Sequence, residues 1–476
     1  MWKKPWGYKE GFACGAGLLV TGLLLQGTAG GIRWELFAWP VNMLVLVLYL
    51  LLLAAMHVLR KRVYGFEWLS HYTSAVSSLI CVVIVTVVMG LVRQVPSTQS
   101  SVDVPGLSKM LSFWPFVLLY IWLASSLGLT ILRTAFPLKV RKIPFLLNHA
   151  GLFVALLAAT FGNADMQRLK MTAWLGQAEW RATDESGKPV ELPLAIELNY
   201  FTIHEYPSKP TPEGRVGGGM PQRFVSAVTV YTQEGSAWQD TIEVNHPLKV
   251  GGWLIYQLGY DRMKGRWSDI SIFELVRDPW LPYVYAGIIM LMLGAACLFI
   301  HGRFGVFSTC LILVLVGVCF YFFRPAIQNE TPMPALQSPW FTPHIVAYMF
   351  AYAMLGAAML MAVYLLWFKK KDIESREMVL CDKLAYVGFA FMTLGMLSGA
   401  IWAKDAWGHY WAWDPKETWA AATWFSYLAY IHFRLGRPSA HRRALVLLLV
   451  SFLLIQMCWY GINYLPSAQG VSVHTY

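Results

Sequence analysis

Eleven apolar stretches, each close to 20 residues long, constrain the fold of this chain more than any other feature. A helix needs about 20 residues to cross a bilayer, and a spanning helix bonds its own backbone polar groups. The stretches predict a polytopic α-helical membrane protein, in agreement with 57% hydrophobic and 14% charged residues over 476 positions. The predicted spans are 11–28, 40–58, 70–92, 111–132, 144–163, 280–300, 304–323, 345–368, 383–402, 418–434 and 443–463.

The net charge of +11 is unevenly divided between the two sides of the predicted membrane. With the N-terminus in the cytoplasm, the loops on that side carry twenty lysines and arginines, against six in the short loops on the other side. Lys and Arg near span ends accumulate on the cytoplasmic side, so the asymmetry predicts an N-in, C-out topology. The basic balance therefore reflects topology, and no nucleic-acid partner is predicted.

Residues 164–278 differ in character from the spans around them. Segments such as 196–201 and 226–231 alternate in polarity or are rich in β-branched residues, and Gly- and Pro-containing turns separate them. This pattern predicts one extracytoplasmic β-rich domain inserted between the fifth and sixth spans. The predicted division is 1–69 for two N-terminal spans, 70–163 for spans three to five, 164–278 for the β-rich domain, 279–300 for span six, and 301–476 for a second membrane domain.

Cysteine usage excludes two classes of protein. None of the seven cysteines lies in the β-rich domain, and the chain has no Cys-x-x-Cys motif. The sequence therefore predicts no disulfide framework, no thiol oxidoreductase of the Cys-x-x-Cys type, and no c-type haem attached to this chain itself.

Segment 402–419, between the ninth and tenth predicted spans, has five tryptophans in 18 positions. Ordinary interfacial belts place one or two Trp at a helix end, so this density is unusual. Gly408 and the pair Asp414-Pro415 interrupt a continuous helix here. We interpret the segment as a broken aromatic shelf suited to a large planar ligand; the alternative is a heavily decorated interfacial loop. The tryptophans are Trp402, Trp407, Trp411, Trp413 and Trp419.

The order of residues in this segment resembles the tryptophan-rich "WWD" signature of the haem-handling proteins of cytochrome c biogenesis. The match covers Trp407-Gly408-x-x-Trp411-x-Trp413-Asp414-Pro415-Lys416-Glu417. It implies that Trp407, Trp411, Trp413 and Asp414 contact haem, with the rings excluding water from the porphyrin plane. Lys404 and Lys416 are near enough to be weighed as propionate partners or, equally, as solvated surface charges.

Two further regions carry a resemblance. Residues 70–300 resemble ResB (CcsB), through a span with an x-His-x-Gly pattern at His149, the run 243–261, and Arg277-Asp278-Pro279 before the next span. The part after residue 300 resembles CcsA (ResC). The whole chain is thus similar to the fused CcsBA-type cytochrome c synthases of the System II pathway. It departs from stand-alone CcsA proteins, which have more spans than the five found after residue 300.

The charge-derived topology sorts four histidines into two levels. His344 and His474 lie outside, beside the shelf, whereas His149 and His432 lie near the inner leaflet. Glu417 is separated from His432 by about 22 Å of helix, too far for one iron to bind at both levels. We therefore predict two bis-imidazole haem sites, an outer one on His344 and His474 and a membrane one on His149 and His432.

Alternatives remain open for the membrane site. The imidazole of His149 is equally explained by a hydrogen bond to the carbonyl of a neighbouring helix. If His149 is not a ligand, His57 or His71, at the cytoplasmic ends of the second and third spans, is the next candidate.

The resemblance implies a protein of the bacterial cytoplasmic (inner) membrane that exports haem b and attaches it to the Cys-x-x-Cys-His motif of apocytochrome c on the extracytoplasmic face. The chain positions iron, vinyls and thiols, and no residue is expected to be a covalent catalyst. Expected partners are apocytochrome c, membrane lipid and a thiol-reducing protein. Two other functions remain open: haem delivery to a chaperone, as for CcmC or CcmF, and b-type electron transfer by a bis-His membrane subunit.

Overall fold

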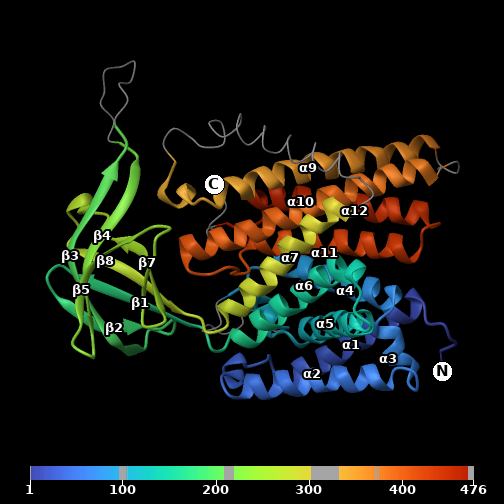
Figure 1. Cartoon of the computed structure of the whole chain (residues 1–476), viewed down its shortest axis with the longest axis horizontal. Helices are drawn as coiled ribbons and strands as arrows, with labels where there is room; N and C mark the ends of the chain where they lie inside the picture. The colour runs from blue at the N-terminus through green and yellow to red at the C-terminus, as the bar shows by residue number, and fades with distance from the viewer. Residues whose placement is uncertain are drawn as a thin grey trace.

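The computed structural model describes residues 2–95, 103, 105–207, 219–301, 332–369, 373 and 375–469. A bundle of roughly parallel and antiparallel helices carries a separate β-sheet domain at one end (Figure 1). The described residues contain eight helices that are long and apolar enough to cross a membrane. The predicted fold class, a polytopic helical membrane protein with an inserted β-rich domain, is confirmed.

Helices lie at ten of the eleven predicted spans, and the remaining one, 304–323, falls outside the described residues. A short additional helix connects the second and third spans. The helices are α1 (Tyr8–Ala29), α2 (Val41–Leu59), α3 (Tyr64–Leu69), α4 (Tyr72–Leu91), α5 (Trp114–Ala135), α6 (Ile143–Gly162), α7 (Leu281–His301), α9 (Phe341–Tyr364), α10 (Ser375–Trp407), α11 (Pro415–Gly436) and α12 (His441–Trp459).

α11 lies in the interior of the helix bundle, and many of its side chains are buried. Tyr427 and Tyr430 are fully buried in a core shared by α4, α5, α9, α10 and α12. Arg434 near its end is also buried and forms an ion pair of 2.7 Å with Asp382 of α10. The Tyr430 hydroxyl donates to the same carboxylate at 2.7 Å, so the charges are paired and bonded, as burial requires. α2 is the opposite case, with leucines such as Leu44 and Leu51 exposed on the outside of the bundle.

The β domain is a single eight-stranded antiparallel sheet in the order β5-β4-β3-β2-β1-β8-β7-β6. Side chains alternate between buried and exposed along β1, which is the period-2 pattern of a strand with one packed face. The buried face carries a core that includes Met171, Ile196 and Phe273. The strands are β1 (Gln167–Trp174), β2 (Ala178–Thr183), β3 (Pro189–Glu205), β4 (Pro221–Thr232), β5 (Ala237–Glu243), β6 (Leu248–Val250), β7 (Trp253–Tyr260) and β8 (Ile270–Arg277).

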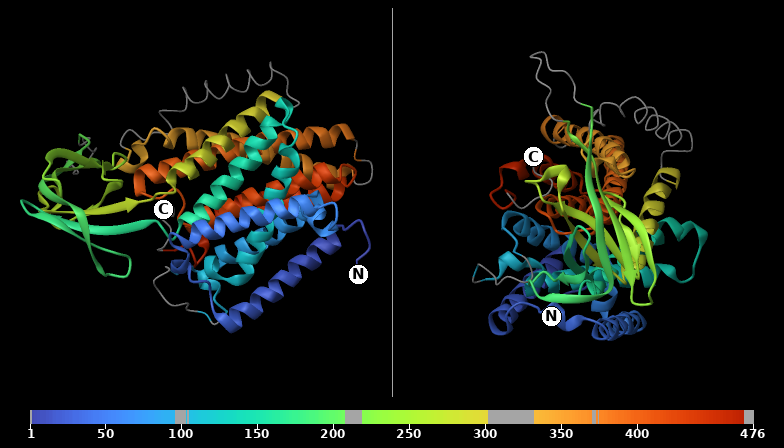
Figure 2. Two further views of the ribbon diagram at one scale, coloured as in Figure 1. Left: turned by 60° about the horizontal axis from the view of Figure 1, so that its bottom comes forward. Right: turned by 90° about the vertical axis from the view of Figure 1, so that its left-hand side faces the viewer.

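Two neighbouring strands join the sheet to the bundle. β1 follows α6 and β8 leads into α7, and the two strands pair along their whole length from Gln167 opposite Arg277. α6 and α7 also pack together, through Ala158, Ile288 and Leu291 among others. The chain therefore leaves and re-enters the bundle at adjacent points, and the sheet extends from that end in the left view of Figure 2.

A second connection holds the sheet near the start of α9. The short turn η5 (Pro334–Gln337) precedes α9, and Asn245 of the β domain donates to the Pro334 carbonyl at 2.7 Å. The Gln337 amide donates to the Gln222 carbonyl at 2.7 Å. These bonds place the beginning of α9, and His344 in its first turn, at the end of the bundle that carries the β domain.

Candidate functional site

His149 of α6 and His432 of α11 lie side by side in the bundle. Their ring centres are 6.1 Å apart, and the ring planes make an angle of 73°. His149 lies in the second turn of α6 and His432 in the last turn but one of α11, so both are at the end of the bundle away from the β domain. Two helices separated by more than 250 residues of chain thus bring together the predicted inner pair.

Each of these rings is held by its own helix. His149 Nδ1 lies 2.8 Å from the Phe145 carbonyl oxygen, and His432 Nδ1 lies 2.8 Å from the Leu428 carbonyl oxygen. A carbonyl oxygen only accepts, so each Nδ1 donates its hydrogen and each Nε2 keeps a lone pair. Phe145 also stacks on His149, with ring centres 3.7 Å apart. A backbone carbonyl thus satisfies one nitrogen of His149, as in the alternative to iron binding, but it comes from its own helix and not from a neighbouring one.

The spacing of the two rings fits one metal ion between them. Metal–imidazole bonds of about 2 Å place the two ligating nitrogens about 4 Å apart and the ring centres about 6 Å apart. The observed 6.1 Å meets that requirement. In the described part of the chain, no ring contact joins His57 or His71 to either histidine, although Tyr72 lies 6.5 Å from His432. The distance between the ring centres is therefore compatible with two imidazoles on one iron, and the assignment of the pair as haem ligands stays a prediction.

His344 occupies a different environment at the other end of the bundle. Its Nδ1 lies 2.8 Å from the carbonyl oxygen of Gly395 on α10, so a neighbouring helix fixes the tautomer and the ring. Gly399, one turn along α10, leaves the space that the imidazole fills, because a Cβ there would lie 2.5 Å from His344 Nδ1. Neither glycine was predicted from the sequence to contact His344, although their Gly-x-x-x-Gly spacing is a signal for close helix approach.

Two of the five tryptophans are buried in helix packing. Trp402 is 4% exposed, and its indole N–H donates to the Ala335 carbonyl at 2.8 Å, which joins α10 to η5. It also lies between His344 and Trp407, with ring centres 5.6 Å and 5.1 Å away. Trp419 is 3% exposed in a core with α12. The expectation of a five-ring shelf is therefore wrong for Trp419, whereas Trp402 borders the ring of His344.

Trp411 and Trp413 lie on the α5 side of the same loop. Their rings meet edge-on at 83° with centres 5.8 Å apart, and Trp413 meets Phe116 of α5 at 90°. Trp413 has a φ of +56°, a left-handed conformation that few non-glycine residues adopt. The Trp411 indole N–H is buried and has no acceptor within the described residues. The loop therefore offers ring edges and an unsatisfied donor instead of one flat platform.

Asp414 and the residues after it begin α11, as the predicted helix break requires. The Asp414 carboxylate accepts from the Lys416 backbone N–H at 2.8 Å, and Pro415 stands at the first helical position. Glu417 completes the capping box by accepting from the backbone N–H groups of Ala412 and Asp414 at 2.8 Å and 3.2 Å. This cap fixes where α11 starts and, through a rigid helix, the position of His432.

Lys404 is buried, so its interpretation as a solvated charge is wrong. It is 2% exposed, and its ammonium donates to the Gly408 carbonyl at 2.8 Å, at the negative end of the α10 dipole. Gly408 has a φ of +79° and faces the β domain so closely that a Cβ would lie 3.1 Å from the Tyr256 ring. Burial raises the pKa of the nearby Asp278, an effect that the Lys404 ammonium opposes. The loop thus packs directly against β7 and β8.

His474 lies outside the described residues, and its pairing with His344 stays a prediction. Lys416 is half-buried, and its role toward a propionate also stays a prediction. The histidines of the β domain, His204 and His246, are exposed.

Two family models match this chain. The model described as "Cytochrome C assembly protein" matches residues 283–468, and the "ResB-like family" model matches residues 139–269. Proteins with the name "Cytochrome c biogenesis protein CcsA" are similar to it in sequence. The protein of Mesostigma viride is 35% identical over 36% of this chain and 66% of its own length. That of Chlamydomonas reinhardtii is 37% identical over 32% and 44%, and that of Chlorella vulgaris is 31% identical over 44% and 79%. The chain thus spans less than two thirds of the first relatives that it matches.

Proposed function

This chain belongs to the CcsA family of cytochrome c biogenesis proteins and joins to it a ResB-like region, and from this premise we propose that it is a cytochrome c synthase that exports haem. It takes haem b from the cytoplasmic side, passes it through the bundle and presents it to apocytochrome c at the end that carries the β domain. The family accounts for a role in cytochrome c maturation and for haem handling, and transport and attachment are the proposal.

The inner pair is the first station of the proposed path. His149 and His432 bind haem iron through Nε2, since each Nδ1 is engaged by its own helix. The single observation that carries the proposal is the 6.1 Å between the two ring centres, the spacing of two axial imidazoles on one iron. Paired ligation also removes the cost of leaving two imidazoles unsatisfied within a membrane.

The outer station lies about His344 and the tryptophan loop. We propose His474 as the second ligand there, from the family resemblance. The buried indole N–H of Trp411 has no acceptor among the described residues and is a suitable donor to a haem propionate. Trp407 and Trp413 exclude water from the porphyrin edge.

The attachment step needs position more than covalent catalysis. Each cysteine thiol of the Cys-x-x-Cys-His motif adds across one haem vinyl: an S–C bond forms, the thiol hydrogen moves to the other vinyl carbon, and the vinyl π bond is consumed. No leaving group and no net oxidant are required. Both thiols must arrive reduced, which is why a thiol-reducing partner is expected. The chain contributes by holding vinyls and thiols together, the kind of positioning that replaces a bimolecular encounter.

Covalent product formation tests the proposal directly. Full-length protein is purified with its endogenous haem and mixed with reduced apocytochrome c, and the product is detected by haem staining after denaturation. Stained apocytochrome is expected, and a Cys-x-x-Cys→Ser-x-x-Ser substrate is the control. Haem that moves to the partner but is lost on denaturation would instead indicate delivery to a chaperone. Haem that stays on the chain and only changes redox state would indicate b-type electron transfer.

A further inference from the structure

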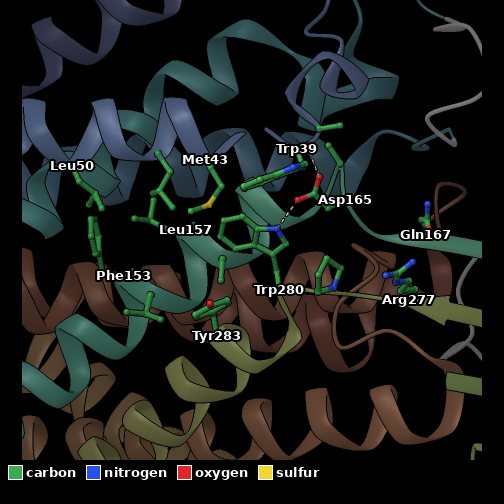
Figure 3. Close-up of a pocket in the computed structure, with 16 residues that line it drawn as sticks. Trp39, Met43, Leu50, Phe153, Leu157, Asp165, Gln167, Arg277, Trp280 and Tyr283 are labelled. Atoms are coloured by element: carbon green, nitrogen blue, oxygen red, sulfur yellow. Dashed lines mark hydrogen bonds between the residues drawn. The ribbon is translucent and has the colours of Figure 1, made fainter. Parts of the chain in front are cut away.

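An apolar groove on the flank of the bundle is unrelated to the two histidine sites. It lies between α2, α6 and the start of α7 and has a volume of about 880 Å³ (Figure 3). α2 packs mainly against α5, and at its outer end it is bonded to α6, where the Asn42 amide donates to the Phe161 carbonyl at 2.9 Å. The two helices therefore leave a furrow between them on a side of the bundle where α2 is exposed.

The walls of the furrow are suited to a hydrocarbon chain. Met43, Leu46 and Leu50 lie three and four residues apart, on one face of α2. Phe153 and Leu157 face them from α6, as Figure 3 shows. From Met43 to Leu50 the wall extends about 10 Å along the helix axis. No imidazole lines the furrow among the described residues, so it offers a haem iron no histidine ligand.

One end of the furrow is polar and carries one charge of each sign. Arg277, the last residue of β8, is exposed and forms no ion pair with any described residue. Asp165 lies between α6 and β1 and accepts three bonds: from the Trp39 backbone N–H at 2.7 Å, from Asn42 at 2.6 Å and from the Trp280 indole at 2.7 Å. A carboxylate has about four acceptor sites, so one remains.

We propose that this furrow is a binding site for a phospholipid whose headgroup carries both a phosphate and a primary ammonium, as in phosphatidylethanolamine. The phosphate pairs with Arg277, the ammonium takes the remaining acceptor site of Asp165, and one acyl chain lies along Met43, Leu46 and Leu50. Arginine binds phosphate oxygens through parallel N–H bonds, and an ammonium is a compact three-fold donor. The indoles of Trp39 and Trp280 flank the headgroup, the position that Trp takes at membrane interfaces.

Retention of lipid by the full-length protein tests the proposal. The protein is exchanged into nanodiscs with equal amounts of phosphatidylethanolamine, phosphatidylglycerol and phosphatidylcholine, and retained lipid is counted by native mass spectrometry. The wild-type chain is expected to retain one phosphatidylethanolamine. Arg277→Gln should reduce that retention by about tenfold or more, as expected for loss of a charge-assisted pair. Arg262→Gln, which removes an exposed arginine elsewhere in the β domain, is the matched control.

A second pair of variants tests the acyl chain. Leu46→Trp should fill the furrow and release the lipid, whereas Leu48→Trp places the same ring two residues away on the exposed side of α2 and should not. The thermal unfolding midpoint of each variant reports its folding. Equal retention in Arg277→Gln and wild type, equal retention of all three lipids, or preference for phosphatidylglycerol would overturn the proposal. So would release of lipid by both members of either pair, or haem recovered from the furrow in place of lipid.

Discussion

The inner and outer histidines differ in what holds them. His149 and His432 are each bonded through Nδ1 to a carbonyl of their own helix, four residues earlier. His344 is bonded to a carbonyl of a different helix, and it fills a space that depends on Gly399 of that helix. The orientation of an inner ring is therefore a local property of α6 or α11. The orientation of the outer ring is a property of how α9 and α10 pack.

The surroundings of the two sites differ in the same sense. The inner pair is half-buried in the helix bundle, where Phe145 and Tyr72 are the neighbouring rings. The outer site continues through Trp402 and Trp407 into a loop that touches the β domain at Gly408. Rings that are fixed locally suit the holding of a cargo. A site assembled from several elements can respond to a substrate at the β domain, which suits the exchange of iron ligands in the attachment step that we propose.

The largest expected effect follows from removing an inner ring. His149→Gly or His432→Gly should abolish the inner haem, because iron loses one of its two protein ligands. The absorption spectrum of purified protein measures this, and added imidazole should restore the bis-imidazole bands. His204→Gly, in the exposed end of β3, is the control and should change nothing. Full bis-imidazole haem in both inner variants would mean that the pair binds no haem.

A smaller effect should separate the outer site from the inner one. In Gly399→Ala the new methyl group would lie 2.5 Å from His344 Nδ1, so the imidazole must move. Overpacking of this kind costs about 1–3 kcal/mol. Cytochrome c production should fall while the inner haem spectrum is kept. Gly356→Ala on α9 is the control: a methyl group there would lie 3.8 Å from Phe452, an ordinary contact, so the variant should behave as wild type. Normal production in Gly399→Ala would make the position of His344 unimportant.

The tryptophan loop allows a finer test of the same distinction. Trp411→Phe keeps an aromatic ring and removes the indole N–H that has no acceptor among the described residues. If that N–H bonds a propionate, the outer haem should bind about 1–2 kcal/mol more weakly, with the inner haem unchanged. Trp419→Phe also removes a buried N–H without a described acceptor, but in the core with α12, and should not affect haem. Haem titration of the two variants compares them, and identical affinities would argue against this contact.

The smallest effect concerns Asp278, which lies where the tryptophan loop contacts the β domain. Burial raises the pKa of Asp278, with the Lys404 ammonium opposing and the Asp165 carboxylate adding to the shift. Because the pKa of Asp278 is higher in the folded state than in the unfolded state, its protonated form stabilises the fold. This contribution is complete below the ordinary pKa of the carboxyl and is lost as pH rises through the raised pKa. The protection factors of the amides around 276–281, which correct for the intrinsic pH dependence of exchange, should therefore fall as pH rises through the raised pKa. Asp278→Asn should remove this dependence, and an unchanged pH profile in the variant would assign it to other groups.

The sequence predicted what depends on single residue patterns. The length of the apolar stretches predicted the helices, and alternation predicted the strands, because each pattern is local. The helix break at Gly408 and Asp414 was equally readable, since glycine and proline act on their own backbone. The pairing of His149 with His432 was predicted from the charge-derived topology, because the topology places both residues at the same depth in the membrane.

Contacts between distant elements were not predictable in this way. Burial of Lys404 follows from the approach of β7 and β8 to the end of α10, which no local pattern in segment 402–419 encodes. The same holds for the burial of Trp402 and Trp419: both belong to the tryptophan-rich segment, but each is buried in an interface between helices. For His344 the decisive partner is a backbone carbonyl, a group that every residue carries and that no sequence pattern distinguishes.

The insertion of the sheet between α6 and α7 has a consequence for the order in which the molecule is made. Roughly 120 residues separate the end of α6 from the start of its packing partner α7. At synthesis rates of about 5–20 residues per second, α6 waits about 6–24 s in the membrane before α7 can join it. His149 waits longer still, since His432 lies on α11, more than 250 residues further along the chain. A nascent chain thus has no inner pair until α11 has been made, so a product terminated before His432 cannot hold haem between these two residues.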